Sequence, residues 1–171
     1  MSAALLYVSN NVRRYHTNPV MAALGQTNGD HQGRCVQLLL YFHERPSLAL
    51  IRAMASHDCG ERGAGDLGAT FKRAHPETAA QHAEAEAAYR RAMFAGLDPL
   101  DDLSEQDMRW LSLIDRLEAY AFMTTHAPSE LVRDGWPIAR SALTAAAWSI
   151  GASPLQGAIT DFLADLEYGI W

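Results

Sequence analysis

The chain has 171 residues, of which 49% are hydrophobic and 20% are charged, and its formal net charge is −6. This length and composition predict one soluble domain, residues 1–171, with a hydrophobic core of its own. The acidic balance excludes a broad basic surface for a nucleic-acid polymer, and no apolar stretch reaches the roughly 18 residues that would predict a membrane span.

Helix signals dominate the first part of the chain. Apolar residues from Asp30 onward predict a largely buried helix that ends just before Pro46, because the residue before a proline disfavours the helical conformation. Ser47 is expected to cap the next helix, which runs toward His57. The four glycines of residues 59–68 predict a loop in which the backbone turns tightly.

Two longer helices are expected next. Pro76 lies at the first turn of an alanine- and glutamate-rich helix that runs to about Phe94. Another helix starts at Ser104, and its apolar residues recur at helical spacing.

The last part of the chain also shows a helical pattern. Ser129 is expected to cap a helix that continues through Trp136 and is kinked or broken at Pro137. Two segments, roughly 138–150 and 154–168, complete the domain. The prediction is therefore an all-α protein, a single compact helical bundle.

The pair His57-Asp58 is the most informative chemical feature. Two polar side chains that end a buried helix need partners, and a divalent metal is the strongest partner available. The dipeptide alone arises by chance, but His31 lies near the start of one predicted helix and Asp115 lies within a later one. Antiparallel packing of neighbouring helices could bring the four together. Two imidazoles and two carboxylates suit Zn, Mn, Fe or Co, whereas Mg usually relies on oxygen ligands.

Asp115 also has a simpler interpretation. It lies in the apolar frame of residues 110–120, where a carboxylate would cost on the order of several kcal/mol unless it were paired or metal-bound. The alternative is an exposed helix residue, or a salt bridge to Arg116 or Arg90.

The two cysteines carry little functional signal. They are too few for a disulfide framework, and their spacing is not that of a zinc knuckle. We expect Cys35 to pack in a helix. Cys59 is expected to be a bystander rather than a nucleophile, because no dedicated base with the usual motif accompanies it.

Several short segments together carry a family resemblance: Arg14-Tyr15, Gly29-Asp30-His31, His57-Asp58 with Glu61, Gly65-Asp66-Leu67, Lys72, and Asp115 to Tyr120. They resemble the HD-domain phosphohydrolases over residues 12–120, and are most similar to the 5′-deoxynucleotidase group and the compact phage dATP triphosphohydrolases. Two departures affect the nucleoside pocket more than the metal. Gln32 follows the first histidine where the family often has serine, and Tyr15 takes the place of the usual tryptophan.

The resemblance implies a metal site and roles for the residues around it. A divalent ion (Zn, Co, Mn or Mg) would be held at one tight site by His31, His57, Asp58 and Asp115. Glu61 would orient or deprotonate the attacking water, and Asp66 would assist it or help Glu61 to bind a second metal.

The same resemblance assigns the substrate contacts. Arg14 and Lys72 are natural phosphate partners. Tyr15 would stack on a nucleobase, and its alternative is a packed aromatic at the start of the domain.

The implied activity is hydrolysis at the α-phosphate of a deoxynucleotide, giving the deoxynucleoside and phosphate, or triphosphate from a dNTP. Deoxyadenylate is favoured because the chain is compact. The alternatives are a 5′-deoxynucleotidase with broad base tolerance, an HD enzyme for a cyclic dinucleotide or an alarmone, and a non-catalytic nucleotide-binding or scaffold protein with an HD core. Glu61 and Asp66 argue against the last of these, because both residues would handle water.

The expected partner is a small-molecule deoxynucleotide, with no nucleic-acid polymer and no membrane. We also expect a homo-oligomer, as among the family's members. The start of the chain lacks the basic segment and long apolar core of a secretory signal. The expected location is therefore the cytoplasm, that of the host if the chain is phage-encoded.

Overall fold

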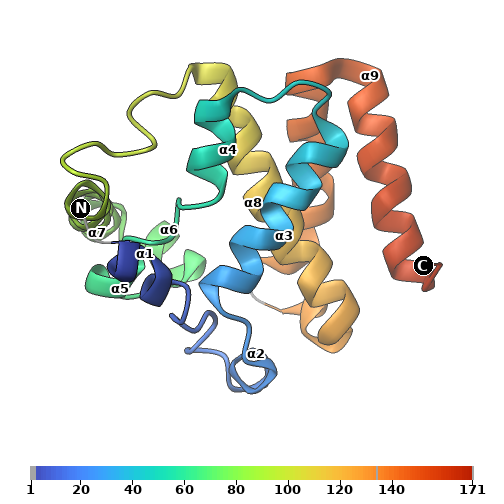
Figure 1. Cartoon of the computed structure of the whole chain (residues 1–171). Helices are drawn as coiled ribbons and strands as arrows, with labels where there is room; N and C mark the ends of the chain where they lie inside the picture. Colours follow the sequence, from blue (N-terminus) through green and yellow to red (C-terminus); the bar gives the residue numbers. More distant parts are fainter. Residues whose placement is uncertain (1–2, 134, 171) are drawn as a thin grey trace.

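A computed structural model describes residues 3–133 and 135–170, and residues 1, 2, 134 and 171 of the predicted domain lie outside this description. The described residues form helices (Figure 1): α1 Ala3–Ser9, α2 Pro19–Leu24, α3 Asn28–Phe42, α4 Leu48–Met54, α5 Glu61–Ala64, α6 Ala69–Ala74, α7 Pro76–Met93, α8 Glu105–His126, the 3-10 turns η1 Pro128–Val132 and η2 Trp136–Ile138, and α9 Ala139–Tyr168. They contain no strand, only one isolated bridge between Arg13 and Thr27, so the all-α prediction is confirmed. None of these helices is both long and apolar enough to cross a membrane. That the bundle is of the HD type stays a prediction.

The central element is α8, which lies against α3 and α4 on one side and α9 on the other (Figure 1). Its buried side chains follow the helical period predicted from the sequence. The shared core is built from side chains that are 2% exposed or less: Cys35, Leu39, Leu50, Ala53, Met54, Leu113, Ile114, Leu117, Leu143, Ala147, Ile159 and Leu163. Burying a side chain such as Leu117 stabilises the fold by about 1.5 to 3 kcal/mol. The helices that carry the four predicted ligands, or lead to them, are therefore fixed to one another by a common core.

Side-chain caps set where these helices begin. Thr27 and Asp30 form a capping box at the start of α3, which places His31 in the first turn of that helix. The Ser47 side chain accepts a hydrogen bond from the backbone N–H of Leu50 at 3.0 Å, as predicted. A second capping box at Ser104 starts α8. The long helix predicted to begin at Pro76 is also confirmed, as α7.

The glycine-rich segment 59–68 is not simply a loop, and this prediction needs correction. It contains the one-turn helix α5, packed on α7. A Cβ at Gly60 would overlap the backbone of Glu86, and one at Gly63 would overlap the ring of Tyr89. These two glycines therefore serve the close approach of helices, and Gly65, with φ of +86°, ends the turn.

The helix predicted from Ser129 through Trp136 is wrong. The described chain forms η1 and η2 there, with Arg133 in an extended conformation between them, and residue 134 lies outside the described residues. Pro137 cannot donate to the carbonyl of Arg133, four residues earlier, and its ring would clash with that carbonyl, so a continuous helix through Trp136 does not form.

The predicted segments 138–150 and 154–168 correspond to the two runs of α9, which are separated by a kink at Ala152. This residue has φ of 54° and ψ of −151°, a combination that essentially only glycine adopts without strain.

We expect Ala152→Gly to raise the free energy of unfolding by about 1 kcal/mol, because glycine relieves the strained backbone. Urea unfolding followed by circular dichroism measures the change. The matched control, Ala145→Gly on an exposed position of the same helix, should lower the free energy of unfolding by about 0.5 to 1 kcal/mol. Equal destabilisation by both changes would contradict the strain at Ala152.

Candidate metal centre

The four predicted ligands meet where three segments of the fold converge. His31 comes from the first turn of α3, His57 and Asp58 follow α4, and Asp115 lies in the middle of α8. Both imidazoles are buried, whereas the side chains of Asp58 and Asp115 are 18% and 38% exposed. The two imidazoles therefore lie on the buried side of the cluster, and the two carboxylates lie on the side that solvent reaches.

The facing atoms are close enough to share one ion. His31 Nε2 lies 3.0 Å from Asp115 Oδ1 and 3.6 Å from Asp58 Oδ2. His57 Nε2 lies 3.8 Å from Asp115 Oδ1 and 3.5 Å from Asp58 Oδ2. Ligand atoms bound at about 2.1 Å from one ion lie about 3.0 to 3.4 Å from each other. These donors thus need only small adjustments to reach a common ion, and the salt bridges from Asp115 to Arg116 or Arg90 do not form among the described residues.

One orphaned atom tests whether the residues fit a metal. His57 Nδ1 donates to the backbone carbonyl of Met54 at 2.9 Å, which leaves Nε2 as the nitrogen available to the cluster. Nε2 is buried, and no described residue lies in hydrogen-bonding geometry with it. Because Nε2 faces two carboxylates, it binds a proton when no metal is present, and a divalent cation would take the place of that proton.

The electrostatics of the cluster also favour a cation. Burial opposes the charged form of His57, but Asp58 and Asp115 outweigh it and raise the pKa of His57 to about 9. Burial likewise opposes charge on Asp58, yet His57 and Arg14 outweigh it and lower the pKa of that carboxyl. Burial opposes charge on Asp115 as well, but the hydrogen bond from His31 and the positive charge of His57 outweigh it and hold the pKa of Asp115 well below its ordinary value. The two carboxylates are therefore ionised and attract positive charge to this point.

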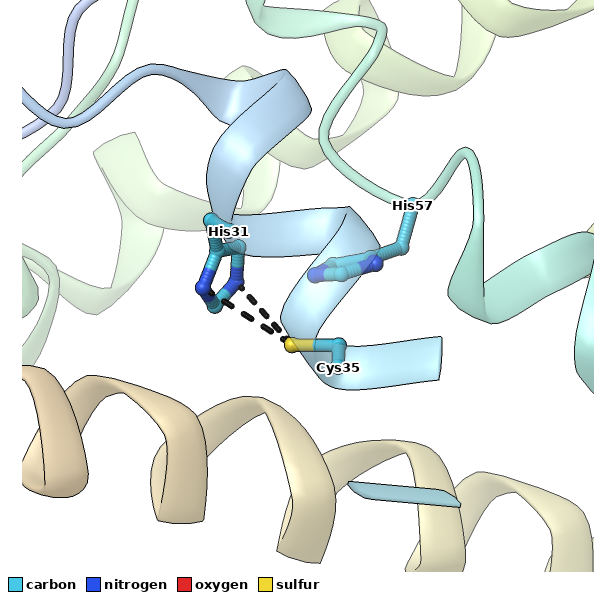
Figure 2. A group of neighbouring side chains, drawn as sticks. All are labelled: His31, Cys35 and His57. Carbon is cyan, nitrogen blue, oxygen red and sulfur yellow. Dashed lines mark hydrogen bonds between the residues drawn. The ribbon is translucent and has the colours of Figure 1, made fainter. Parts of the chain in front are cut away.

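A sulfur atom lies beside the imidazoles. Cys35 packs in α3, as predicted, but its Sγ also lies 3.6 Å from His31 Nε2, which the sequence interpretation missed. Figure 2 shows that this thiol and the rings of His31 and His57 face a common space. Their ligand atoms lie within 4.8 Å of one another, so this buried group could hold a metal ion. Burial raises the pKa of the Cys35 thiol well above its ordinary value, so sulfur would have to lose a proton to bind.

We expect both thiols of the native protein to resist an aromatic disulfide reagent. Cys35 and Cys59 are fully buried, and burial raises the pKa of Cys59 to about 12. Labelling should be negligible over minutes in buffer and should reach two thiols per chain in guanidinium chloride. Rapid labelling of one thiol in the native protein, absent from the Cys59→Ala variant, would contradict the bystander role of Cys59.

Glu61 is a buried acid whose surroundings suit it to exchange a proton. Asn28 Nδ2 donates to Glu61 Oε2 at 2.8 Å and to the backbone carbonyl of Asp58 at 3.1 Å, so one amide links the Glu61 carboxylate to the backbone of Asp58. Burial, with repulsion from Asp58 and Asp66, raises the pKa of Glu61 to about 8. A carboxyl group with this pKa exchanges its proton close to neutral pH, and its ionised form can accept a proton from water.

Arg14 lies at the cluster, where its NH1 group pairs with Asp58 Oδ2. Its Nε is buried and has no hydrogen-bond partner within residues 3–133 and 135–170, which leaves a donor unused. The next residue, Tyr15, has φ of +58°, and its ring stacks on Phe122 with centroids 6.1 Å apart. This packing matches the alternative interpretation of Tyr15 as a packed aromatic, and base stacking stays a prediction.

The remaining two predicted residues lie in other contacts. Lys72 Nζ is 3.5 Å from Glu86 Oε1 on α7, so the lysine pairs with an acid outside the four-ligand cluster. Asp66 Oδ2 lies 3.5 Å from Nδ1 of the exposed His16. Asp66 still acts on Glu61 through its charge, whereas a phosphate contact by Lys72 stays a prediction.

Sequence reasoning missed three buried polar partners of the cluster: Asn28, Gln26 and Glu118. Glu118 pairs with His31 Nδ1 and accepts a hydrogen bond from Gln26 Nε2 at 2.8 Å. The sequence did contain one signal for Glu118: it lies three residues after Asp115 in α8 and therefore shares the same face of the helix.

Comparison with known proteins found no match to this chain among family models, curated proteins or solved structures.

Proposed function

We propose that this protein is a metal-dependent phosphohydrolase that cleaves deoxynucleotides at the α-phosphate. The observation that carries the proposal is the convergence of two imidazoles and two ionised carboxylates around the orphaned Nε2 of His57. A mixed nitrogen and oxygen donor set suits Zn, Mn or Co, and Mg less well. The residues that would hold the ion are His31, His57, Asp58 and Asp115.

The two carboxylates are better candidates than Cys35 to complete the imidazole pair. The pKa values of Asp58 and Asp115 are lowered, so these groups are ready to bind a cation, whereas the raised pKa of Cys35 keeps its sulfur protonated. The carboxylates also lie on the solvent-accessible side, where a substrate would arrive.

When bound, a divalent ion lowers the pKa of water and neutralises charge that develops on a phosphate oxygen. The protein's own contribution is proton transfer and phosphate binding. Glu61 accepts the proton of the attacking water, and Asn28 holds its carboxylate in place. Arg14 offers its unused Nε–H to a phosphate oxygen while its NH1 group keeps the pairing with Asp58.

The substrate class, deoxynucleotides, comes from the resemblance of the short segments to HD-domain phosphohydrolases. The geometry of the cluster supports metal-dependent hydrolysis as the reaction. Chelator-treated protein should be reloaded with Mn, Co, Zn or Mg and incubated with each deoxynucleoside mono- and triphosphate. We expect release of the deoxynucleoside with phosphate or triphosphate, fastest with deoxyadenylate. In oxygen-18 water the label should enter the phosphate product, because water attacks phosphorus.

Two results would contradict the proposal. The first is absence of product from every deoxynucleotide while the protein holds one metal per chain. The second is label in the deoxynucleoside rather than in phosphate, because that would mean attack at carbon.

A further inference from the structure

Glu118 is a carboxylate in an unusual place. Glu118 lies on α8, one turn after Asp115, and is only 1% exposed. Its Oε2 pairs with Nδ1 of the fully buried His31. Its other oxygen accepts a hydrogen bond from Gln26 Nε2 at 2.8 Å. Both oxygens are thus occupied by donors inside the protein.

Little positive charge compensates this burial. Among the described residues, the cationic group within salt-bridge distance of Glu118 besides His31 is Arg34, whose NH1 lies 3.8 Å away and beyond hydrogen-bonding distance. A buried charge without a close cation is costly, and an apolar side chain would serve packing at least as well. The position of Glu118 therefore indicates a role toward His31 rather than toward stability.

The pairing determines which ring nitrogen of His31 is free. A carboxylate only accepts, so Nδ1 carries a hydrogen, and Nε2 is the nitrogen left to bind a metal. Nε2 faces Asp115 Oδ1 at 3.0 Å, so it points into the cluster and donates to that oxygen when no metal is bound, and a metal ion would take the place of this hydrogen. His57 is oriented in the same way, but by the neutral carbonyl of Met54. His31 thus has the stronger, charged acceptor.

Gln26 connects this pair to the substrate side of the cluster. It is 3% exposed, and its backbone carbonyl accepts a hydrogen bond from the Arg14 N–H at 3.0 Å. Its amide therefore fixes the second oxygen of Glu118, and its backbone fixes the residue that pairs with Asp58.

We propose that Glu118, held by Gln26, is a positioning residue that orients His31 and raises the basicity of its Nε2 for a divalent metal ion. The inference rests on the metal site of the proposed function but not on the reaction. Removing an acceptor of this kind lowers metal affinity by about 10- to 100-fold.

The test compares Glu118→Gln with Glu130→Gln. Glu130 is also a buried acid, 5% exposed, and it accepts a hydrogen bond from Asn18 and pairs with Arg133 away from the four ligands. Competition with a chromogenic chelator measures the affinity for Zn and Co. We expect a loss of about 10- to 100-fold for Glu118→Gln, partial recovery in Glu118→Asp, and a change of less than about threefold for Glu130→Gln. Unchanged metal affinity in a folded Glu118→Gln protein would overturn the proposal.

A measurement on the unaltered chain keeps the proposal testable if Glu118→Gln does not fold. Nitrogen-15 NMR of the zinc-loaded protein should show His31 protonated at Nδ1 and bound through Nε2. Binding through Nδ1 would overturn the proposal. Metal affinity and the NMR of His31 are both independent of turnover. A protein that binds metal but hydrolyses no deoxynucleotide would therefore contradict the proposed function, whereas the role of Glu118 would still be decided by these two measurements.

Discussion

Asp115→Asn is expected to keep the helical fold, lose the metal and lower the turnover of deoxynucleotides about 1000-fold or more, a loss of about 4 kcal/mol in transition-state stabilisation. The Asp115 carboxylate lies 3.0 Å from His31 Nε2 and 3.8 Å from His57 Nε2, and a neutral amide of the same shape cannot compensate a divalent ion there. Elemental analysis gives the metal content, product release gives turnover, and circular dichroism reports the fold.

The matched control is Asp101→Asn. Asp101 is an exposed acid that pairs with Arg91 at 3.3 Å, so this variant carries the same change in charge outside the site. It should keep both metal and turnover. A full complement of metal in Asp115→Asn would contradict the four-ligand site.

Glu61→Gln is expected to separate the metal from the reaction. The variant should keep its metal, because Glu61 is outside the ligand cluster, and should lose turnover by about 100- to 10,000-fold, because an amide cannot accept a proton. The free energy of unfolding should not fall, since burial and repulsion already raise the pKa of Glu61 to about 8 and the amide resembles the protonated acid. Metal analysis and kcat measured side by side check both expectations.

Glu84→Gln, on an exposed position of α7, is the control for the loss of a negative charge and should be indistinguishable from the unaltered protein. Turnover of Glu61→Gln at the rate of the control would show that another group accepts the proton, and Asp66 would be the next residue to test.

The longer helices could be predicted because each carries its own local signals. A cap at Ser47 or Ser104, or a proline at position 76, marks a start, and apolar spacing marks the buried face. By contrast, the six-residue helix α6 has no side-chain cap, whereas the equally short α2 has Asn18 as its cap and Pro19 in its first turn, signals that the sequence reasoning overlooked. Helices this short do not form from propensity alone, and packing against the rest of the fold stabilises them.

Glycine and proline misled the sequence reasoning where their role depends on tertiary contacts. Gly60 and Gly63 indicate a loop when read alone, but they allow α5 to approach α7 closely. The sequence places the break of the helix from Ser129 at Pro137, but the chain is already extended at Arg133, four residues earlier, because Pro137 cannot bond to the carbonyl of that residue.

The candidate ligands were found because histidine and aspartate at the ends or inside of apolar helices need partners. Their supporting residues could not be found in that way, since Asn28 and Gln26 become partners only when the helices pack. Cys35 did carry a signal, because it lies four residues after His31 and therefore on the same face of α3.

The most direct test of the metal centre is a crystal structure of the cobalt-loaded protein, with the ion located by anomalous scattering. We predict one ion at about 2.0 to 2.2 Å from four groups: His31 Nε2, His57 Nε2, and a carboxylate oxygen from each of Asp58 and Asp115. An ion bound to Cys35 Sγ at about 2.3 Å with both carboxylates turned away, or no ion at this place, would contradict the account.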